Sequence, residues 1–149
     1  MIRYHDSGYL DMGAVLSAPY PFIVVVGARG CGKTYGALED VVKRHETFIY
    51  FRRTETVLKL VCDKALHVFK KLNADHDWTI KPEMKNGVGR FFDEGGDFYG
   101  YAAALSTFHN VRGFDGSDVK TLIFDEFIPE ETERRTFNQW SALQNAIET

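Results

Sequence analysis

The stretch GARGCGKT, residues 27–34, constrains the fold of this chain more than any other part of it. Its spacing, Gly-x4-Gly-Lys-Thr, is that of a phosphate-binding loop, in which glycines let consecutive backbone N–H groups point at phosphate oxygens. The apolar run FIVVV at 22–26 precedes the loop, and apolar residues at helical spacing follow it over 37–42. The pattern therefore predicts a buried strand, the loop, and then a helix over residues 33–45.

Each position of the loop has a role in holding the phosphates of ATP. Lys33 supplies a full charge for the β- and γ-phosphates, and Thr34 offers a hydroxyl to Mg²⁺. The following helix adds the partial positive charge of its N-terminus. The alternative is a glycine-rich turn with a surface lysine, which the flanking strand and helix patterns disfavour. The predicted phosphate-binding residues are Gly27, Ala28, Arg29, Gly30, Cys31, Gly32, Lys33 and Thr34.

A second catalytic candidate is the acidic pair that ends the apolar run LIFDE at 122–126. At the carboxyl end of a strand the backbone can turn both side chains toward one crevice. Asp125 would then hold Mg²⁺, usually through water, and Glu126 would polarise the water that attacks the γ-phosphate. The competing interpretation is a strand that runs into a solvated acidic turn, because the acidic stretch PEETE follows at 129–133.

The rest of the chain alternates between strand-like and helix-like patterns. Residues 47–52 predict a second strand, parallel to the first, and residues 54–72 predict one amphipathic helix with His67 on its polar face. Strand-like runs separated by hairpin-type turns predict an antiparallel meander. The runs are 78–84, 88–93 and 97–105.

These patterns together predict an α/β fold of the P-loop NTPase type. Its central sheet is expected to be mainly parallel and flanked by helices, with the meander inserted so that its last strand joins the main sheet. A final helix is expected near residues 136–148. With 149 residues, the chain is long enough for one domain.

Charge and composition exclude several classes of protein. The net charge of −3 and the pI of about 5.9 argue against a generic cationic coat for nucleic acid, so any DNA contact is expected to be local. Cys31 and Cys62 lack metal-type spacing and indicate a reduced, cytosolic compartment. No apolar run is long enough to span a bilayer, so no membrane partner is expected.

Three motifs together, GARGCGKTY, FIYFRR and TLIFDEF, resemble the ATPase domain of bacteriophage DNA-packaging motors, in particular those of phi29-type podoviruses, which are related to terminase large subunits. The resemblance runs from about residue 20 to about residue 148. It implies an ASCE-type ATPase that needs ATP and Mg²⁺ and extends the nucleotide-binding set to Tyr35. It also implies a homo-oligomeric ring, expected to be a pentamer, at the portal vertex of a procapsid in the host cytoplasm. This ring would pump double-stranded DNA into the procapsid. A packaging RNA is a further expected partner.

Arg52 and Arg53 match the paired arginines that follow the second strand in that family. The resemblance implies that one of them senses nucleotide or holds Glu126 when DNA is absent, and Arg53 is the catalytic candidate. The alternative is a solvated strand end paired with Glu55.

The family pattern continues with a nucleotide-sensing strand, an arginine that acts on the neighbouring subunit and a nuclease-like C-terminal domain. This sequence reaches Thr149 before all three, which predicts a truncated ATPase domain with weak turnover in isolation. Two other classes stay open. One is a different P-loop enzyme, such as a nucleotide kinase or a helicase-loader ATPase, and the other is a non-catalytic nucleotide-binding assembly module.

Overall fold

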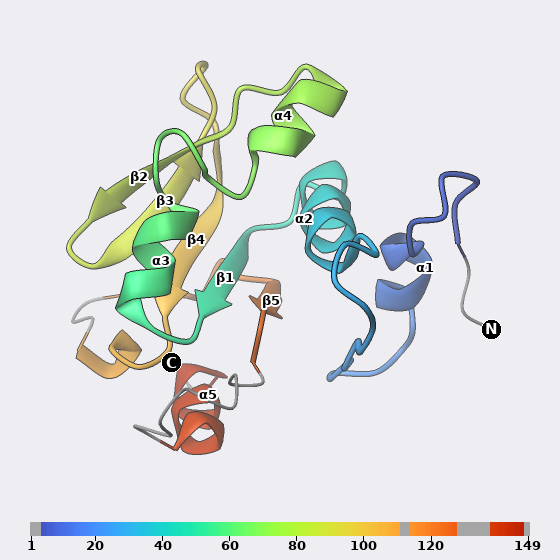
Figure 1. Cartoon of the computed structure of the whole chain (residues 1–149). Helices are drawn as coiled ribbons and strands as arrows, with labels where there is room; N and C mark the ends of the chain where they lie inside the picture. The colour runs from blue at the N-terminus through green and yellow to red at the C-terminus, as the bar shows by residue number, and fades with distance from the viewer. Residues whose placement is uncertain (1–3, 111–113, 128–137, 148–149) are drawn as a thin grey trace. The chain divides into compact units, whose positions relative to one another are not determined.

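The computed structural model describes residues 4–110, 114–127 and 138–147. The chain forms two compact units, Met1–His45 and Glu46–Thr149, and each is described by itself. Figure 1 labels their helices and strands. No helix in the described residues is both long and apolar enough to cross a membrane.

The first unit contains two helices, α1 (Met12–Leu16) and α2 (Lys33–Lys43). Asp11 caps α1, because its Oδ1 accepts a hydrogen bond from the backbone N–H of Ala14 at 2.9 Å. The two helices pack closely at Gly36, where a Cβ atom would lie 2.7 Å from the Cγ atom of Met12. The helix predicted after the loop is thus confirmed as α2.

The strand predicted over residues 22–26 is wrong in this structure. These residues are neither helix nor strand, and the side chains of Phe22, Val24 and Val26 are 63%, 70% and 78% exposed. Ile23 and Val25 are half-buried, so the side chains still alternate as they do in an extended chain. A strand exists only where a neighbour pairs with its backbone, and the only β pairing described in this unit is the single bridge between Tyr4 and Leu10. The second strand therefore has no first strand to run parallel to.

The second unit is built on a five-stranded sheet with the strand order β2-β3-β4-β1-β5. The predicted strand at 47–52 and the predicted meander are both confirmed. The asparagine and glycine between β2 and β3 have φ values of 52° and 81°, as a two-residue hairpin turn requires. The elements of this unit are β1 (Phe48–Arg52), α3 (Glu55–Val61), α4 (Lys70–His76), β2 (Lys81–Lys85), β3 (Val88–Phe92), β4 (Phe98–Ala104), a 3-10 helix (Phe108–Asn110), β5 (Thr121–Phe124) and α5 (Gln139–Ile147).

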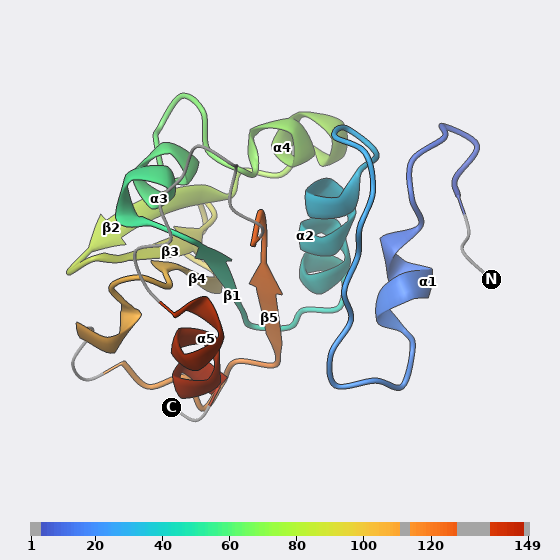
Figure 2. The ribbon, with the colours of Figure 1, turned by 60° about the horizontal axis from the view of Figure 1, so that its bottom comes forward.

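The sheet is mixed, whereas the sequence predicted a mainly parallel one. β1 runs parallel to β4 and to β5, and Figure 2 shows β1 and β5 side by side. The pairs β2–β3 and β3–β4 are antiparallel. The meander contributes as many strand pairs as the parallel part, because all three of its strands belong to the same sheet.

The two faces of the sheet are buried by different elements. On one face the ring of Phe48 lies 6.1 Å from Phe69 and 5.8 Å from Phe91, and α3 packs against β1 and β4 (Figure 1). Close packing there depends on Gly100, where a Cβ atom would lie 2.5 Å from the carbonyl oxygen of Phe48. On the other face Phe51 contacts Phe108 edge to face, in a core cluster that α5 joins.

The helix predicted over residues 54–72 is in fact two helices, α3 and α4. The break is local in origin, because Oδ1 of Asp63 accepts hydrogen bonds from the N–H groups of Ala65 and Leu66 at 2.8 and 3.1 Å and fixes a turn there. The chain changes direction, and His67, predicted on the polar face, is only 9% exposed. Burial, followed by the charges of nearby lysines, lowers the pKa of its imidazole.

Candidate functional site

The predicted phosphate-binding loop lies in the first unit, where two glycines shape its backbone. Gly30 and Gly32 have φ values of 81° and 89°, a left-handed conformation that side chains disfavour. Gly32 is also the N-cap of α2, so the loop leads directly into the N-terminus of that helix. The sequence pattern thus corresponds to the loop-to-helix geometry that anion binding needs.

The N–H groups of the loop are available to a ligand. None of the backbone N–H groups of residues 28–33 donates to a backbone carbonyl in the described part of the chain. The side chain of Lys33 lies over the same loop: its Nζ atom donates to the carbonyl oxygens of Gly27 and Ala28 at 2.9 and 2.8 Å and lies 3.4 Å from Sγ of Cys31. The ammonium group of Lys33 is thus held beside the backbone N–H groups of the loop by two uncharged carbonyl oxygens.

The N-terminal hairpin supports the loop, which the sequence did not indicate. The ring of Tyr9 lies against Gly32, where a Cβ atom would come within 3.1 Å of it. The N–H of Leu10 donates to the carbonyl of Cys31 at 3.0 Å. The local sequence pattern gives no signal for this packing, because Tyr9 lies well before the loop along the chain.

The predicted acidic pair lies in the second unit, just after β5. The N–H of Asp125 continues the sheet by donating to the carbonyl of Phe51 at 3.2 Å. Glu126 then adopts φ 52°, an uncommon conformation for a residue with a side chain, and its N–H donates to Oδ1 of Asp125 at 3.0 Å. This turn brings both carboxylates to the same arginine, Arg52.

Arg52 and Tyr50 extend from β1 to the acidic pair. Nη1 of Arg52 donates to Oδ2 of Asp125 at 3.3 Å, and Nη2 of Arg52 is ion-paired with Oε2 of Glu126. The hydroxyl of Tyr50 donates to the same Oδ2 of Asp125 at 2.8 Å. Sequence reasoning missed Tyr50; alternation with Arg52 along β1 was the signal that could have found it, because residues i and i+2 share a face.

The electrostatics of this cluster keep the tyrosine a donor and the arginine charged. Burial, and then the charge of Asp125, raises the pKa of the Tyr50 hydroxyl. Burial opposes the charge on Arg52, but the interactions with Tyr50, Glu126 and Asp125 outweigh it, so the pKa of the guanidinium is raised. Asp125 is mostly covered, with 19% of its side chain exposed, whereas Glu126 is 61% exposed.

The structure brings Arg52, and not Arg53, to the acidic pair. Arg53 is 8% exposed, and its Nε donates to the amide oxygen of Gln139 at 3.2 Å when that amide is oriented to satisfy both of its ends. Arg53 thus joins the end of β1 to α5, and its catalytic role stays a prediction. Glu55, its expected alternative partner, is ion-paired with Lys59 at 3.0 Å.

Comparison with known proteins gives consistent matches across this architecture. Residues 5–149 match the profile of the family described as "Podovirus DNA encapsidation protein (Gp16)". The DNA packaging proteins of Bacillus phages phi29 and B103 are 33% and 32% identical over 130 residues; each match covers 84% of this chain, but only 37% and 38% of those proteins. The crystal structure of the N-terminal domain of the DNA packaging ATPase from bacteriophage phi29 matches with a TM-score of 0.66 and 29% identity, over 81% of this chain and 61% of that one. The phi29 genome packaging motor assembly matches with a TM-score of 0.70 and 28% identity, over 95% and 42%.

Proposed function

The chain belongs to the Podovirus DNA encapsidation protein (Gp16) family, and from that premise we propose that it is an ASCE-type P-loop ATPase domain of a phage DNA-packaging motor. Its reaction would be Mg²⁺-dependent ATP hydrolysis coupled to translocation of double-stranded DNA into a procapsid. The observation that carries the proposal is the loop of the first unit, in which left-handed glycines, unbonded N–H groups and Lys33 precede a helix N-terminus.

The loop would hold the triphosphate of ATP through its N–H groups. Lys33 would exchange the carbonyl oxygens of Gly27 and Ala28 for charged phosphate oxygens, which are stronger acceptors. Gly30 and Gly32 have φ values above 80°, so neither can be replaced without backbone strain. Their conformation would preorganise the loop for contact with phosphate.

The residues present fit a magnesium ion, because hydroxyl and carboxylate oxygens are the hard ligands that this cation prefers. On the sequence motifs alone, Thr34 and Asp125 are the proposed ligands, the latter through water, and the ion would neutralise charge on the phosphates. Glu126, the more exposed of the two carboxylates, would take a proton from the attacking water once Arg52 has released it.

Arg52 would hold this machinery inactive in the state described. It is ion-paired with Asp125 and Glu126, so both carboxylates already have a cationic partner. Metal binding at Asp125 and water activation by Glu126 would therefore require Arg52 to withdraw, which fits the role inferred for one arginine of this pair in the absence of DNA.

The motor would be a homo-oligomeric ring, with five subunits expected, that meets the portal of the procapsid and a packaging RNA in the host cytoplasm. The matched relatives are much longer than this chain, which covers 37% of the phi29 protein. Turnover by the 149-residue chain alone is expected to be weak, since groups supplied by a neighbour accelerate such reactions by several orders of magnitude.

Replacement of Lys33 by alanine tests the phosphate site. Calorimetric titration of a slowly hydrolysed ATP analogue with Mg²⁺ is expected to show binding that weakens about 10- to 150-fold in Lys33→Ala, because a charged hydrogen bond to phosphate is lost. Lys64→Ala, at an exposed lysine of the other unit, is the matched control and should bind as the unchanged chain does. Equal binding by Lys33→Ala, or no binding by any of the three, would contradict the proposed site.

Replacement of Tyr50 by phenylalanine tests how Asp125 is positioned. The change keeps the buried ring but removes the 2.8 Å hydrogen bond to Oδ2, so the Mg²⁺ concentration that half-saturates analogue binding is expected to rise about 10- to 100-fold. Tyr99→Phe is the control, because its hydroxyl donates to Asp93 at 3.0 Å elsewhere in the unit. An unchanged Mg²⁺ dependence in Tyr50→Phe would show that the tyrosine does not position the aspartate.

A further inference from the structure

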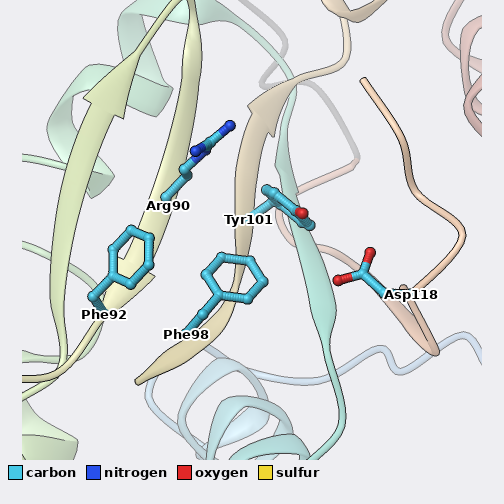
Figure 3. A pocket seen from close by; sticks show the side chains of 5 residues that line it. All are labelled: Arg90, Phe92, Phe98, Tyr101 and Asp118. Carbon is cyan, nitrogen blue, oxygen red and sulfur yellow. The ribbon is translucent and has the colours of Figure 1, made fainter. Parts of the chain in front are cut away.

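A pocket of about 260 Å³ opens on the same sheet face as the core cluster that α5 joins, because its lining residue Tyr101 packs against that cluster. Arg90 and Phe92 are two residues apart on β3 and pair with Tyr101 and Phe98 of β4, so all four share one face of the sheet. Asp118, from the segment before β5, closes the opposite edge. Figure 3 shows the rings of Phe92 and Phe98 beside each other, with Arg90 and Asp118 on different sides of Tyr101.

The floor of the pocket is aromatic and its rings brace one another. Phe98 lies 5.3 Å from Phe92 and contacts Tyr101 edge to face at 4.8 Å. Tyr101 in turn packs against Phe114, at the border of the core cluster that includes α5. The floor is therefore held by the core and offers half-buried ring surface to a flat ligand.

Three polar groups at this floor have no protein partner in the described part of the chain: the guanidinium of Arg90, the hydroxyl of Tyr101 and the carboxylate of Asp118. Arg90 and Asp118 are exposed and form no ion pair with each other. Both still act on Tyr101, since burial and then Asp118 raise the pKa of its hydroxyl while Arg90 lowers it. The pocket thus offers a donor and an acceptor of opposite charge around aromatic rings that are tilted to one another.

We propose that this pocket binds a guanine base of unpaired nucleic acid. Among the common bases only guanine presents two adjacent donors, which suit the carboxylate of Asp118, together with acceptors at O6 and N7 that suit the guanidinium of Arg90. Stacking on one of the two tilted rings, Phe92 or Phe98, with the edge of the other beside the base, supplies the apolar part of the affinity. The volume lies near the lower limit for small-molecule sites, about 300 Å³, and so suits one base.

Titration of the 149-residue chain with guanosine, followed by backbone amide NMR, tests this proposal. Guanosine carries no phosphate, so the result does not depend on the phosphate-binding loop and is independent of the proposed ATPase function. Chemical-shift changes are expected over β3, β4 and the residues beside Asp118, with adenosine, cytidine and uridine binding at least about tenfold more weakly.

Two variants and a matched control separate recognition from general surface effects. Asp118→Asn and Arg90→Gln should each weaken guanosine binding about tenfold, the effect of losing one good contact to a base edge. Glu83→Gln removes one negative charge, as Asp118→Asn does, but on β2, where Glu83 pairs with Arg90 in the sheet. This control should leave guanosine binding unchanged. All three positions are exposed, so unfolding temperatures should stay the same.

Single-stranded pentanucleotides identify the source of the base. A five-residue RNA with one central guanine among uridines is compared with the DNA strand that carries guanine among thymines, each against the same strand with a central adenine. Preference for guanine over adenine in either strand supports the pocket, and the tighter strand names the source. Equal affinity for all four nucleosides, no binding of guanosine, or equal losses in Asp118→Asn and Glu83→Gln would each overturn the proposal.

Discussion

Replacement of Glu126 by glutamine is expected to lower ATP hydrolysis by about 10²- to 10⁴-fold and to leave nucleotide binding unchanged. Glutamine keeps the size of the side chain but cannot take a proton from water. The binding contacts proposed for ATP come from the loop of the first unit and from Lys33, which this change does not touch. Glutamine has the same length and branching as glutamate at this exposed position, so the left-handed turn at residue 126 is expected to be retained.

Single-turnover assays with labelled ATP in excess enzyme give the required sensitivity for a weak activity. The matched control is Glu94→Gln, which removes an exposed carboxylate that is ion-paired with Lys81 at 2.6 Å and lies in the meander. That variant should hydrolyse ATP at the unchanged rate. Full activity in Glu126→Gln would rule out Glu126 as the general base and would show that another group activates the attacking water.

Replacement of Phe48 by alanine is expected to reduce the free energy of unfolding by about 3–5 kcal/mol. The ring is fully buried and packs against both Phe69 and Phe91, so its loss leaves a cavity under α4 and beside the meander. Domains of this size are stabilised by only about 5–15 kcal/mol, and a large part of the stability would therefore be lost.

Urea denaturation followed by circular dichroism measures this change. Leu60→Ala on α3 removes an aliphatic side chain that is 59% exposed and should cost less than about 0.5 kcal/mol. A loss below about 1 kcal/mol in Phe48→Ala would mean that the three rings do not form the main core contact on that face of the sheet.

Local patterns predicted the elements whose signals are carried by neighbouring residues. The glycines and Lys33 fix the loop and the start of α2, and Asn86 with Gly87 fixes a hairpin turn, because backbone conformation there is set by the residues themselves. β1 was predictable for a similar reason, since its aromatic and β-branched residues favour a pleated, buried strand.

Features set by distant partners were not predictable in this way. The run at 22–26 has every local property of a buried strand, yet strand formation needs a partner that sequence periodicity does not reveal. The break near Asp63 depends on one side chain competing with helical hydrogen bonds, which outweighed the spacing of the apolar residues.

The acidic pair was predictable as a motif but its partners were not. Asp125 and Glu126 follow an apolar run, which located them at a strand end. Which of two adjacent arginines reaches them depends on the alternation of β1, and the hydrogen bond from Tyr50 depends on the parallel register of β1 against β5. Both are facts of strand pairing rather than of local sequence.

The position of β1 between two paired strands also determines how slowly its amides exchange with deuterated solvent. β4 and β5 pair with it on both sides, and its first four residues are buried. Amides in such a strand exchange only when the whole unit unfolds, so their protection reports the global free energy of unfolding. Tyr50 and Arg52 lie on this strand. A ligand that binds only the folded unit should therefore slow amide exchange here by the same factor by which it raises the folding equilibrium constant.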